Sequence, residues 1–411
     1  MKTISRRRLL HAAAAAPLLS AFGAARGAIA RASGRARSAL KVAVVGAGAF
    51  GGWTALHLRR AGAEVTLLDA WGPGHSRASS GGETRVIRAV YGADRPYVEL
   101  VVRSLRLWAE EERRSGRSLY QRTGSLWMFG EDDAYARDSL PLIRQAGLAF
   151  EELSLDEAGR RFPQVRFDGV RHVYHEPEAG YMLARQACQV VREAFEVEGG
   201  EYRQLAAQPG PVASGRMGAL RLSDGSALEA DAYVFACGPW LGRLLPDAVG
   251  ARIRPTRQEV FFFGTPAGDE RWASGRLPVW VDFGERVFYG IPGAERRGFK
   301  IADDTHGPDF DPTGGDRTPS PEGLARARAF LARRFPELST APLVEARVCQ
   351  YENSPDGHYI CDRHPGAENA WILGGGSGHG FKNGPAFGEH AAGRVLGKAA
   401  VDPFFALARL G

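Results

Sequence analysis

A glycine-rich turn between a strand pattern and a helical pattern is the feature that most constrains this chain of 411 residues. The run Lys41-Val42-Ala43-Val44-Val45 is apolar after its first residue, as in strands buried on both faces of a parallel sheet. It leads into Gly46-Ala47-Gly48-Ala49-Phe50-Gly51, a helical stretch to Arg60 and a second strand at 64–68. Asp69 follows Gly51 by 18 residues. The arrangement predicts a βαβ unit that binds a dinucleotide.

Each glycine of such a unit has a separate role. Gly46 permits a tight turn, Gly48 leaves room for the pyrophosphate, and Gly51 lets the helix pack closely on the sheet. The N-terminus of the helix faces the phosphates, and Asp69 is expected to accept a hydrogen bond from the adenosine ribose. An ordinary glycine-rich turn between a strand and a helix is the alternative.

The positive charge of the chain is confined to its first 32 residues. The whole chain has 53 Lys and Arg against 47 Asp and Glu, a formal charge of +6. The segment 1–32 has no acid and carries the basic residues Lys2, Arg6, Arg7, Arg8, Arg26 and Arg31. Removing it leaves 53 − 6 = 47 bases against 47 acids. A neutral body gives no general attraction to nucleic acid, and we expect no nucleic-acid partner.

Residues 1–32 are typical of a twin-arginine export signal. The pair Arg6-Arg7 lies between Ser5 and Arg8-Leu9-Leu10, and an alanine-rich apolar run follows at 12–25. Ala30-Arg31-Ala32 offers the small-residue pattern of a cleavage site. We expect the twin-arginine export machinery to carry the folded protein to the periplasm or the medium.

An N-terminal membrane anchor is the alternative for this segment. Pro17 and Gly23 interrupt the apolar run, which is shorter than the ~20 residues needed to span a bilayer. No later stretch approaches that length, so we expect no stable membrane insertion.

The four cysteines indicate neither a disulfide scaffold nor a metal site. Cys188, Cys237, Cys349 and Cys361 are few for the length and lack paired metal-ligand spacing. We therefore expect no metal. Cys188 and Cys237 are most simply small core residues.

The rest of the chain predicts strands and helices in a βαβ pattern at both ends with mixed β sequence between. Helices are expected at 97–114, 180–198, 321–335 and from 385, and strands at 124–129, 217–222, 232–236, 259–263, 279–281, 287–289, 299–301 and 370–373. The fold class is therefore α/β, or α+β overall, with a discontinuous Rossmann-like nucleotide domain and an inserted sheet-rich domain. The boundaries are 40–120, 168–245 and 349–411 for the first domain, and 121–167 and 246–348 for the second.

Four further motifs resemble one family over nearly the whole chain after residue 32. They are Gly82-Glu83-Thr84-Arg85-Val86-Ile87-Arg88 with Tyr91-Gly92, Gly298-Phe299-Lys300, Cys349-Gln350-Tyr351, and Gly376-Ser377-Gly378-His379-Gly380-Phe381-Lys382. In this order they resemble the FAD-dependent amine oxidases of the monomeric sarcosine oxidase and N-methyltryptophan oxidase type, within the D-amino-acid-oxidase-like flavoproteins. The fructosyl-amino-acid oxidases are similar in the last motif. The discontinuous domain would then bind FAD and the inserted domain the substrate.

The resemblance implies that FAD is attached covalently through the thiol of Cys349. A soft nucleophile suits that bond. The resemblance also places Arg85 as a cation beside the flavin ring. The turn Gly378-His379-Gly380 would aim backbone N–H groups at the pyrimidine edge of the flavin. A buried structural thiol at position 349 is the alternative.

The resemblance also implies the residues that handle the substrate. Arg88 and Lys382 would hold a carboxylate at the flavin face, and Tyr351 would position the amine. Lys300 would activate O₂. The chain has five Lys against 48 Arg, and two of the five, Lys300 and Lys382, fall in these motifs. The alternatives are a surface Arg88, a loop-capping Lys382, and a Lys300 that pairs with Asp303, Asp304 or another nearby carboxylate.

The sequence departs from the sarcosine-type pattern at three places. Asp304 stands where those enzymes have an imidazole, Ser79-Ser80-Gly81-Gly82 replaces a His-containing turn, and Ala93 replaces an acid. The added carboxylate of Asp304 makes sarcosine doubtful and favours a bulkier or more cationic amine.

The predicted function is flavin-dependent oxidation of the C–N bond of an amine by O₂. The substrate is expected to be an N-substituted amino acid, and the products an imine, which water hydrolyses, and H₂O₂. The cofactor supplies the redox chemistry, while the protein orients the reactants and supplies charge. The alternatives are a periplasmic dehydrogenase that passes electrons to a quinone or carrier, and a non-catalytic flavin-binding redox protein.

Overall fold

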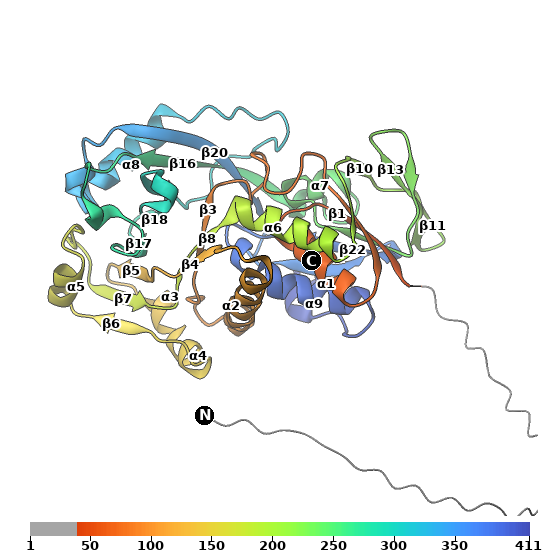
Figure 1. Cartoon of the computed structure of the whole chain (residues 1–411), viewed down its shortest axis with the longest axis horizontal. Helices are drawn as coiled ribbons and strands as arrows, with labels where there is room; N and C mark the ends of the chain where they lie inside the picture. The colour runs from red at the N-terminus through yellow and green to blue at the C-terminus, as the bar shows by residue number, and fades with distance from the viewer. Residues whose placement is uncertain (1–38) are drawn as a thin grey trace, which may run out of the picture. The chain divides into compact units, whose positions relative to one another are not determined.

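The computed structural model describes residues 39–411, and the predicted export signal at 1–32 lies outside the described residues. The described part contains two large sheets. Figure 1 shows helices α1, α6 and α9 around one of them, while strands β5, β7, β16, β17, β18 and β20 lie on the other side of the molecule with α8.

The first large sheet has six strands in the order β21-β22-β15-β1-β2-β9. The strands are β1 (Lys41–Val45), β2 (Glu64–Leu68), β9 (Glu201–Arg203), β15 (Ala232–Phe235), β21 (Ile360–His364) and β22 (Ala367–Gly374). All neighbours are parallel except β21, which is antiparallel to β22. A parallel sheet assembled from distant segments confirms the predicted α/β class and Rossmann-like core.

Both faces of β1 are buried, as the continuous apolar run predicted. Three helices cover one face of the sheet: α1 (Ala49–Arg60), α6 (Ala184–Val197) and α9 (Gly384–Val395). Val42 and Val44 belong to the core on this side. Ala43 and Val45 point the other way and join a core with Leu220 and Leu241. That core includes residues of β10 (Ala207–Gln208), β13 (Leu220–Leu222) and α7 (Leu241–Leu244).

Helices α1 and α9 approach each other closely because glycines lie between them. A Cβ at Gly388 would lie 2.7 Å from the Cβ of Trp53. Another helix, α2 (Arg95–Ser115), reaches the start of α9. There the indole of Trp108 donates a hydrogen bond over 3.1 Å to the carbonyl of Lys382. This contact fixes the backbone of a predicted site residue.

The second large sheet has eight strands in the order β20-β16-β19-β18-β17-β5-β7-β6. They are β5 (Ser125–Phe129), β6 (Glu151–Leu153), β7 (His172–Glu176), β16 (Arg254–Phe263), β17 (Val279–Phe283), β18 (Val287–Ile291), β19 (Phe299–Asp303) and β20 (Leu343–Asn353). Helix α8 (Pro321–Arg334) packs on this sheet through Phe330, whose ring centroid lies 5.3 Å from that of Trp280 and 4.4 Å from that of Phe288. The aromatic packing anchors α8 on the second core.

Smaller sheets and several short elements accompany the two large sheets. One three-stranded sheet contains β3 (Thr84–Ile87), β8 (Gly180–Leu183) and β4 (Tyr120–Gln121). The short elements are α3 (Ala134–Arg137), α4 (Leu140–Gln145), α5 (Leu155–Arg161), β11 (Val212–Ala213), β12 (Arg216–Met217) and β14 (Ala227–Leu228). Strand β3 carries Arg85, so this small sheet positions part of the site.

Two predicted elements differ in the structure. The helix expected at 180–198 begins only at Ala184, because Gly180–Leu183 forms strand β8 against β3. A Cβ at Gly180 would lie 2.0 Å from the carbonyl oxygen of Gln121, so close pairing with β4 requires glycine there. The strand expected at 217–222 is divided between β12 and β13. The long helix α2 and the last helix α9 lie where the patterns predicted them.

The predicted domain boundaries do not coincide with the division between the large sheets. Strand β7 lies within 168–245, which was assigned to the cofactor domain, yet it pairs with β5 and β6 of the eight-stranded sheet. Strand β20 crosses the predicted boundary at 349. The boundaries themselves stay a prediction.

Three further findings concern the described residues. Within 39–411 no helix is both long and apolar enough to cross a membrane. The same residues contain no group of three or more His, Cys, Asp or Glu side chains arranged to hold a metal ion. All four cysteines are free thiols.

Candidate active site

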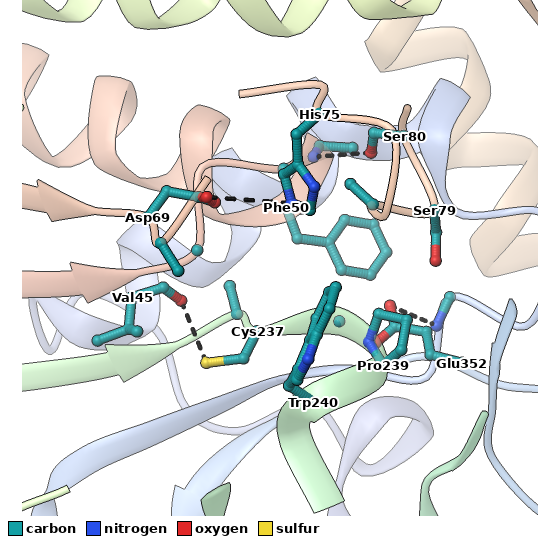
Figure 2. A pocket seen from close by; sticks show the side chains of 18 of the residues that line it. Val45, Phe50, Asp69, His75, Ser79, Ser80, Cys237, Pro239, Trp240 and Glu352 are labelled. Carbon is teal, nitrogen blue, oxygen red and sulfur yellow. Dashed lines mark hydrogen bonds and ion pairs between the residues drawn. The ribbon is translucent and has the colours of Figure 1, made fainter. Parts of the chain in front are cut away.

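A cavity of about 410 Å³ lies where strands β1, β2 and β15 end. Ligands of open α/β sheets bind at this edge. The predicted cofactor-binding residues that line it are Gly46, Gly48, Asp69, Gly378 and Gly380. Figure 2 shows the rings of Phe50, His75 and Trp240 around the cavity, with Asp69 and Glu352 on opposite sides.

The three glycines of the turn after β1, at positions 46, 48 and 51, differ in their surroundings. Gly46 has φ +108°, and a Cβ there would lie 2.3 Å from the carbonyl oxygen of Ala236. A Cβ at Gly51 would lie 1.8 Å from the carbonyl oxygen of Gly46. At Gly48 the only close atom is Oγ of Ser80 at 3.7 Å, an ordinary contact. Packing alone therefore does not require glycine at 48, and the space beside it belongs to the cavity.

Asp69 follows β2, and its carboxylate accepts hydrogen bonds that link it to the glycine-rich turn after β1. One carboxylate oxygen accepts the N–H of Ala47 over 2.8 Å, and the other accepts those of Trp71 and Gly72 over 2.9 Å. Two carboxylate oxygens offer about four acceptor sites, so the group can accept a further hydrogen bond from a ligand. Its place in the cavity wall fits the predicted ribose contact.

The loop at 376–382 packs against the aromatic wall of the site. Gly378 has φ +81°, and a Cβ there would lie 2.6 Å from the ring of Tyr351. The N–H of His379 donates to the carbonyl of Gly376 over 2.8 Å, so it has a partner within the loop. The imidazole Nδ1 lies 2.9 Å from the hydroxyl of Tyr359, and burial holds the pKa of His379 well below its usual value. A neutral His379 therefore stabilises the loop at 376–382 through its hydrogen bond with Tyr359 and does not line the cavity.

Arg85 and Cys349 come together from distant strands. The guanidinium of Arg85 in β3 donates to the sulfur of Cys349 in β20 over 3.4 Å. It also donates to the carbonyl of Thr84 over 2.7 Å. A Cβ at Gly82 would lie 2.4 Å from a guanidinium nitrogen of Arg85. The glycine of this motif therefore makes room for the cation beside the thiol.

Lys300 is a buried cation without an acidic partner among the described residues. It lies on β19, is 2% exposed, and donates to the carbonyl and hydroxyl oxygens of Thr84 over 2.9 and 3.2 Å. Burial, followed by the charge of Arg85, lowers the pKa of Lys300 to about 7. Asp303 pairs instead with Arg286 and Arg326, which removes the predicted alternative of a Lys300–Asp303 pair.

Arg88 and Lys382 lie over the same aromatic ring. The guanidinium carbon of Arg88 is 4.2 Å from the ring centroid of Tyr91, and Nζ of Lys382 is 5.1 Å from it. Arg88 donates to the carbonyl of Val90, and Lys382 donates to that of His379 over 2.8 Å. Neither cation has a carboxylate within 4.0 Å in the part of the chain that the structure describes. Burial and then Arg88 hold the pKa of Lys382 well below its usual value.

Asp304 and Tyr351 are joined in the same region. The hydroxyl of Tyr351 donates to a carboxylate oxygen of Asp304 over 2.7 Å. Burial raises the pKa of Asp304, while the hydrogen bond from Tyr351 and the charges of Arg88 and Lys382 act in the opposite direction. In the structure the predicted substrate residues Arg88, Lys382 and Asp304 therefore lie close enough for their charges to interact.

A second cavity, of about 340 Å³, lies on the other side of Arg85 and Tyr351, which line both. Cys349 and Tyr289 line only the second. Lys300, Arg88, Lys382, Asp304, Gly51 and His379 line neither of the two. Arg85 and Tyr351 thus belong to the walls of both cavities, and Cys349 belongs to the wall of the second cavity beside Arg85.

Two acids of this region were missed by the sequence interpretation. Glu176 on β7 accepts hydrogen bonds from the N–H of Ala89 and, over 3.3 Å, from the indole of Trp127. Burial raises its pKa to about 7. Glu352 lines the dinucleotide cavity. Its position next to Tyr351 in the Cys-x-Tyr motif was the available signal, whereas nothing marked Glu176.

Cys237 is partly buried and packs against the core that contains Leu220 and Leu241, as expected. It also lines the dinucleotide cavity, and its thiol donates to the carbonyl of Val45 over 3.5 Å. Cys188 is buried as expected, and burial raises its pKa to about 12. The turn after β15 exposes Cys237 because the chain leaves the sheet at Gly238, which has φ +54°.

The residues around the larger cavity fit a dinucleotide. Gly48 leaves its own neighbourhood open, Asp69 offers an acceptor, and the carboxyl of Glu352 has an oxygen without a hydrogen-bond partner in the described chain. The second large sheet carries Lys300, a buried cation without an acidic partner in the described chain. Together these features define a dinucleotide-binding protein with a cationic region next to the cavity.

The chain belongs to the FAD dependent oxidoreductase (DAO) family, whose model matches residues 41–394. It is 30% identical over 356 residues to "Monomeric sarcosine oxidase" of Bacillus sp. (strain B-0618), covering 85% of this chain and 90% of that relative. It is 29% identical over 375 residues to "N-methyl-L-tryptophan oxidase" of Salmonella enteritidis PT4, covering 86% and 94%. The crystal structure of L-proline dehydrogenase from P. horikoshii superposes with a TM-score of 0.76 at 20% identity, covering 89% and 96%.

These comparisons confirm the predicted family resemblance and the predicted cofactor, FAD. The protein is an FAD-dependent oxidoreductase that acts on CH–NH groups. FAD supplies redox chemistry when bound: it accepts two electrons from the substrate. Gly46, Gly48, Asp69 and Gly378 are the residues that would hold it.

Proposed function

We propose that this protein oxidises the C–N bond of an N-substituted amino acid and passes the electrons to O₂, giving an imine and H₂O₂. The observation that carries the proposal is the pair of cations, half-buried Arg88 and buried Lys382, over one tyrosine ring and without a carboxylate partner in the described chain. Two converging cations with little access to water favour a bound anion, and a substrate carboxylate meets that demand. The names of the curated relatives support an N-methylated amino acid.

The chain's own residues would bind and orient this substrate. Arg88 offers a planar guanidinium for the carboxylate, and Lys382 a compact charge. An anion beside Lys382 favours its protonated form, so binding of the carboxylate offsets the effect of burial on the pKa of Lys382. Tyr351 would hold the amine, with its hydroxyl oriented by Asp304.

We propose that the substrate carries a second positive charge. Asp304 is half-buried and feels the charges of Arg88 and Lys382, so a substrate held by these cations would have an acid near its site. A bound cation favours the ionised form of that acid and gains a charge-assisted hydrogen bond. Basic N-methylated amino acids therefore fit better than sarcosine.

The O₂ step is assigned to Lys300. Its ammonium has no acidic partner in the described residues and lies against Thr84. A fixed cation in a buried place stabilises the negative charge that O₂ acquires on reduction. If Lys300 does not act on O₂, the alternative of a dehydrogenase with a quinone or protein acceptor gains support.

We propose that FAD is held covalently through Cys349 and that the protein is exported by the twin-arginine route. Cys349 supports the first proposal because it lines the second cavity and lies beside the guanidinium of Arg85, which lines both cavities. Ser5 to Leu10 support the second. Changing Arg6 and Arg7 together to Lys should leave the protein in the cytoplasm. Normal export of that variant would contradict a twin-arginine signal at residues 1–32.

A panel of amines with peroxide detection tests the function. The purified holoprotein is mixed in air with sarcosine, N-methyl-lysine, N-methyl-leucine and the decarboxylated form of each. We expect H₂O₂ with the amino acids, most with the basic one, and little with decarboxylated analogues. Oxidation that reduces a quinone analogue but yields no peroxide supports the dehydrogenase, and no turnover with either acceptor supports a non-catalytic flavoprotein.

A further inference from the structure

Glu352 is an acid in the wall of the dinucleotide cavity that the proposed reaction does not use. Its side chain is 8% exposed and lines the cavity. One carboxyl oxygen, Oε1, accepts the N–H of Gly376 over 3.3 Å, and the other, Oε2, has no hydrogen-bond partner in the described chain. No Lys, Arg or His among residues 39–411 comes within 4.0 Å of it. Such an acid needs a physical explanation, because buried carboxylates are normally paired.

Backbone from two turns lies around the carboxyl group. A Cβ at Gly376 would lie 3.0 Å from Oε1, and one at Gly238 or Gly374 would lie 3.6 Å from Oε2. Gly374 ends strand β22, and Gly238 follows β15, so the acid sits at the carboxyl edge of the parallel sheet. Figure 2 shows Glu352 beside Pro239, across the cavity from Asp69. The chain brings this acid to the edge where the dinucleotide binds.

The environment decides the protonation state of Glu352. Burial raises its pKa to about 8, and no neighbouring cation opposes the shift. At pH 7 the group is therefore mostly a neutral carboxylic acid with one O–H donor. The described chain offers Oε2 no acceptor, so the donor is left for a ligand in the cavity.

We propose that Glu352 binds FAD as a protonated acid, donating a hydrogen bond to an oxygen of the dinucleotide. FAD carries phosphate and hydroxyl oxygens, all of which are acceptors. Loss of the proton would remove the donor and bring a negative charge toward an anionic ligand, so FAD should bind more weakly to the ionised form. The inference rests on the family's cofactor and is independent of the amine that is oxidised.

Other titratable groups face the same cavity, and their effect on the pH dependence of FAD binding must be distinguished from that of Glu352. They are Asp69, His75, Arg85, Cys237, Arg243 and Tyr351, with Lys300 next to Arg85. Burial lowers the pKa of His75 and raises those of Cys237 and Tyr351, which moves these three away from the range between pH 7 and 9. Lys300 titrates near the lower end of that range. A Glu352→Gln variant keeps all of them and removes only the titration of Glu352.

The test is a titration of apoprotein with FAD, read by flavin and tryptophan fluorescence. It uses the full chain with Cys349→Ser, so that a covalent bond cannot hide the affinity. With Glu352 present, the dissociation constant should rise about tenfold between pH 6.5 and 9, as one proton with a pKa near 8 requires. Glu352→Gln, which keeps a donor of similar shape, should bind FAD at both pH values about as well as the parent does at pH 6.5.

A Glu352→Met variant provides the second arm, because it keeps the volume and removes the donor. We expect FAD binding at least about tenfold weaker than the parent's at pH 6.5, with a melting temperature of the apoprotein within a few degrees of the parent. The proposal is overturned if Glu352→Gln shows the same weakening at pH 9 as the parent, or if Glu352→Met binds FAD as the parent does. Either result would make Glu352 a structural acid. Neither depends on turnover of an amine, so failure of the proposed function remains a separate outcome.

Discussion

The hydroxyl of Tyr351 donates a hydrogen bond to a carboxylate oxygen of Asp304 over 2.7 Å. Tyr351 lies on β20 and Asp304 follows β19, two strands that flank β16 in the eight-stranded sheet. The sheet thus brings an acid next to the tyrosine that forms part of the wall of both cavities. In the proposed reaction this pair selects the amine.

Replacing Asp304 by Asn should reduce the preference for a basic substrate. A hydrogen bond to a charged group contributes about 1.5–3 kcal/mol, so kcat/KM for N-methyl-lysine should fall roughly 10- to 100-fold. The value for N-methyl-leucine should change much less. Asp303→Asn is the matched control, because that neighbouring acid pairs with Arg286 and Arg326. Equal losses for both substrates in Asp304→Asn would contradict a role in selection.

Removing either cation of the proposed carboxylate site should weaken substrate binding. Arg88→Ala and Lys382→Met are each expected to cost about 2–4 kcal/mol toward an acidic amine, because the remaining buried charges lose a partner. FAD should remain bound in both, which its absorbance reports. If wild type oxidises an amino acid and its decarboxylated analogue equally well, the carboxylate site does not exist.

Covalent attachment is tested by denaturing the holoprotein with acid. Yellow colour should stay with the precipitate of wild type and leave that of Cys349→Ser. Cys237→Ser is a matched control, since Cys237 is the cysteine that lines the larger cavity, and its precipitate should stay yellow. A colourless wild-type precipitate from flavin-loaded protein would show that FAD is not bound through Cys349.

Lys300→Met should separate the two half-reactions in stopped flow. A preorganised cation is worth about 3–4 kcal/mol, so reoxidation by O₂ should slow by roughly two to three powers of ten while anaerobic reduction changes little. Because burial lowers the pKa of Lys300 to about 7, its charged form is lost as the pH rises through 7. Reoxidation of wild type should therefore slow by about tenfold from pH 6 to 8, and that of the variant should be flat. Unchanged reoxidation in Lys300→Met would remove its role.

The parts of the fold that follow from local pattern were predictable. The continuous apolar run before Gly46 and the acid at 69 predicted β1, α1 and β2, because strand burial and turn geometry are local properties. The strand at Gly180–Leu183 was not, since its apolar residues also continue the pattern of helix α6 and only pairing with β3 decides between them.

The candidate site depends on contacts that no local pattern contains. Arg85 and Cys349 are 264 residues apart, and their contact requires β3 to meet the edge strand β20. The family resemblance pointed to both residues but not to Glu352. Glu352 stands out because its Oε2 has no hydrogen-bond partner and no cation lies near it in the described chain. Charge partners are a property of the folded chain, so an unpaired acid is recognised only there.

Anaerobic titration of the holoprotein with N-methyl-lysine, followed by admission of air, tests directly whether the protein is an oxidase of N-substituted amino acids. We expect the substrate to bleach the flavin absorbance near one equivalent, and air to restore it with release of about one H₂O₂ per amine oxidised. Failure of every N-substituted amino acid to bleach the flavin, in protein whose FAD content has been measured, would contradict this expectation.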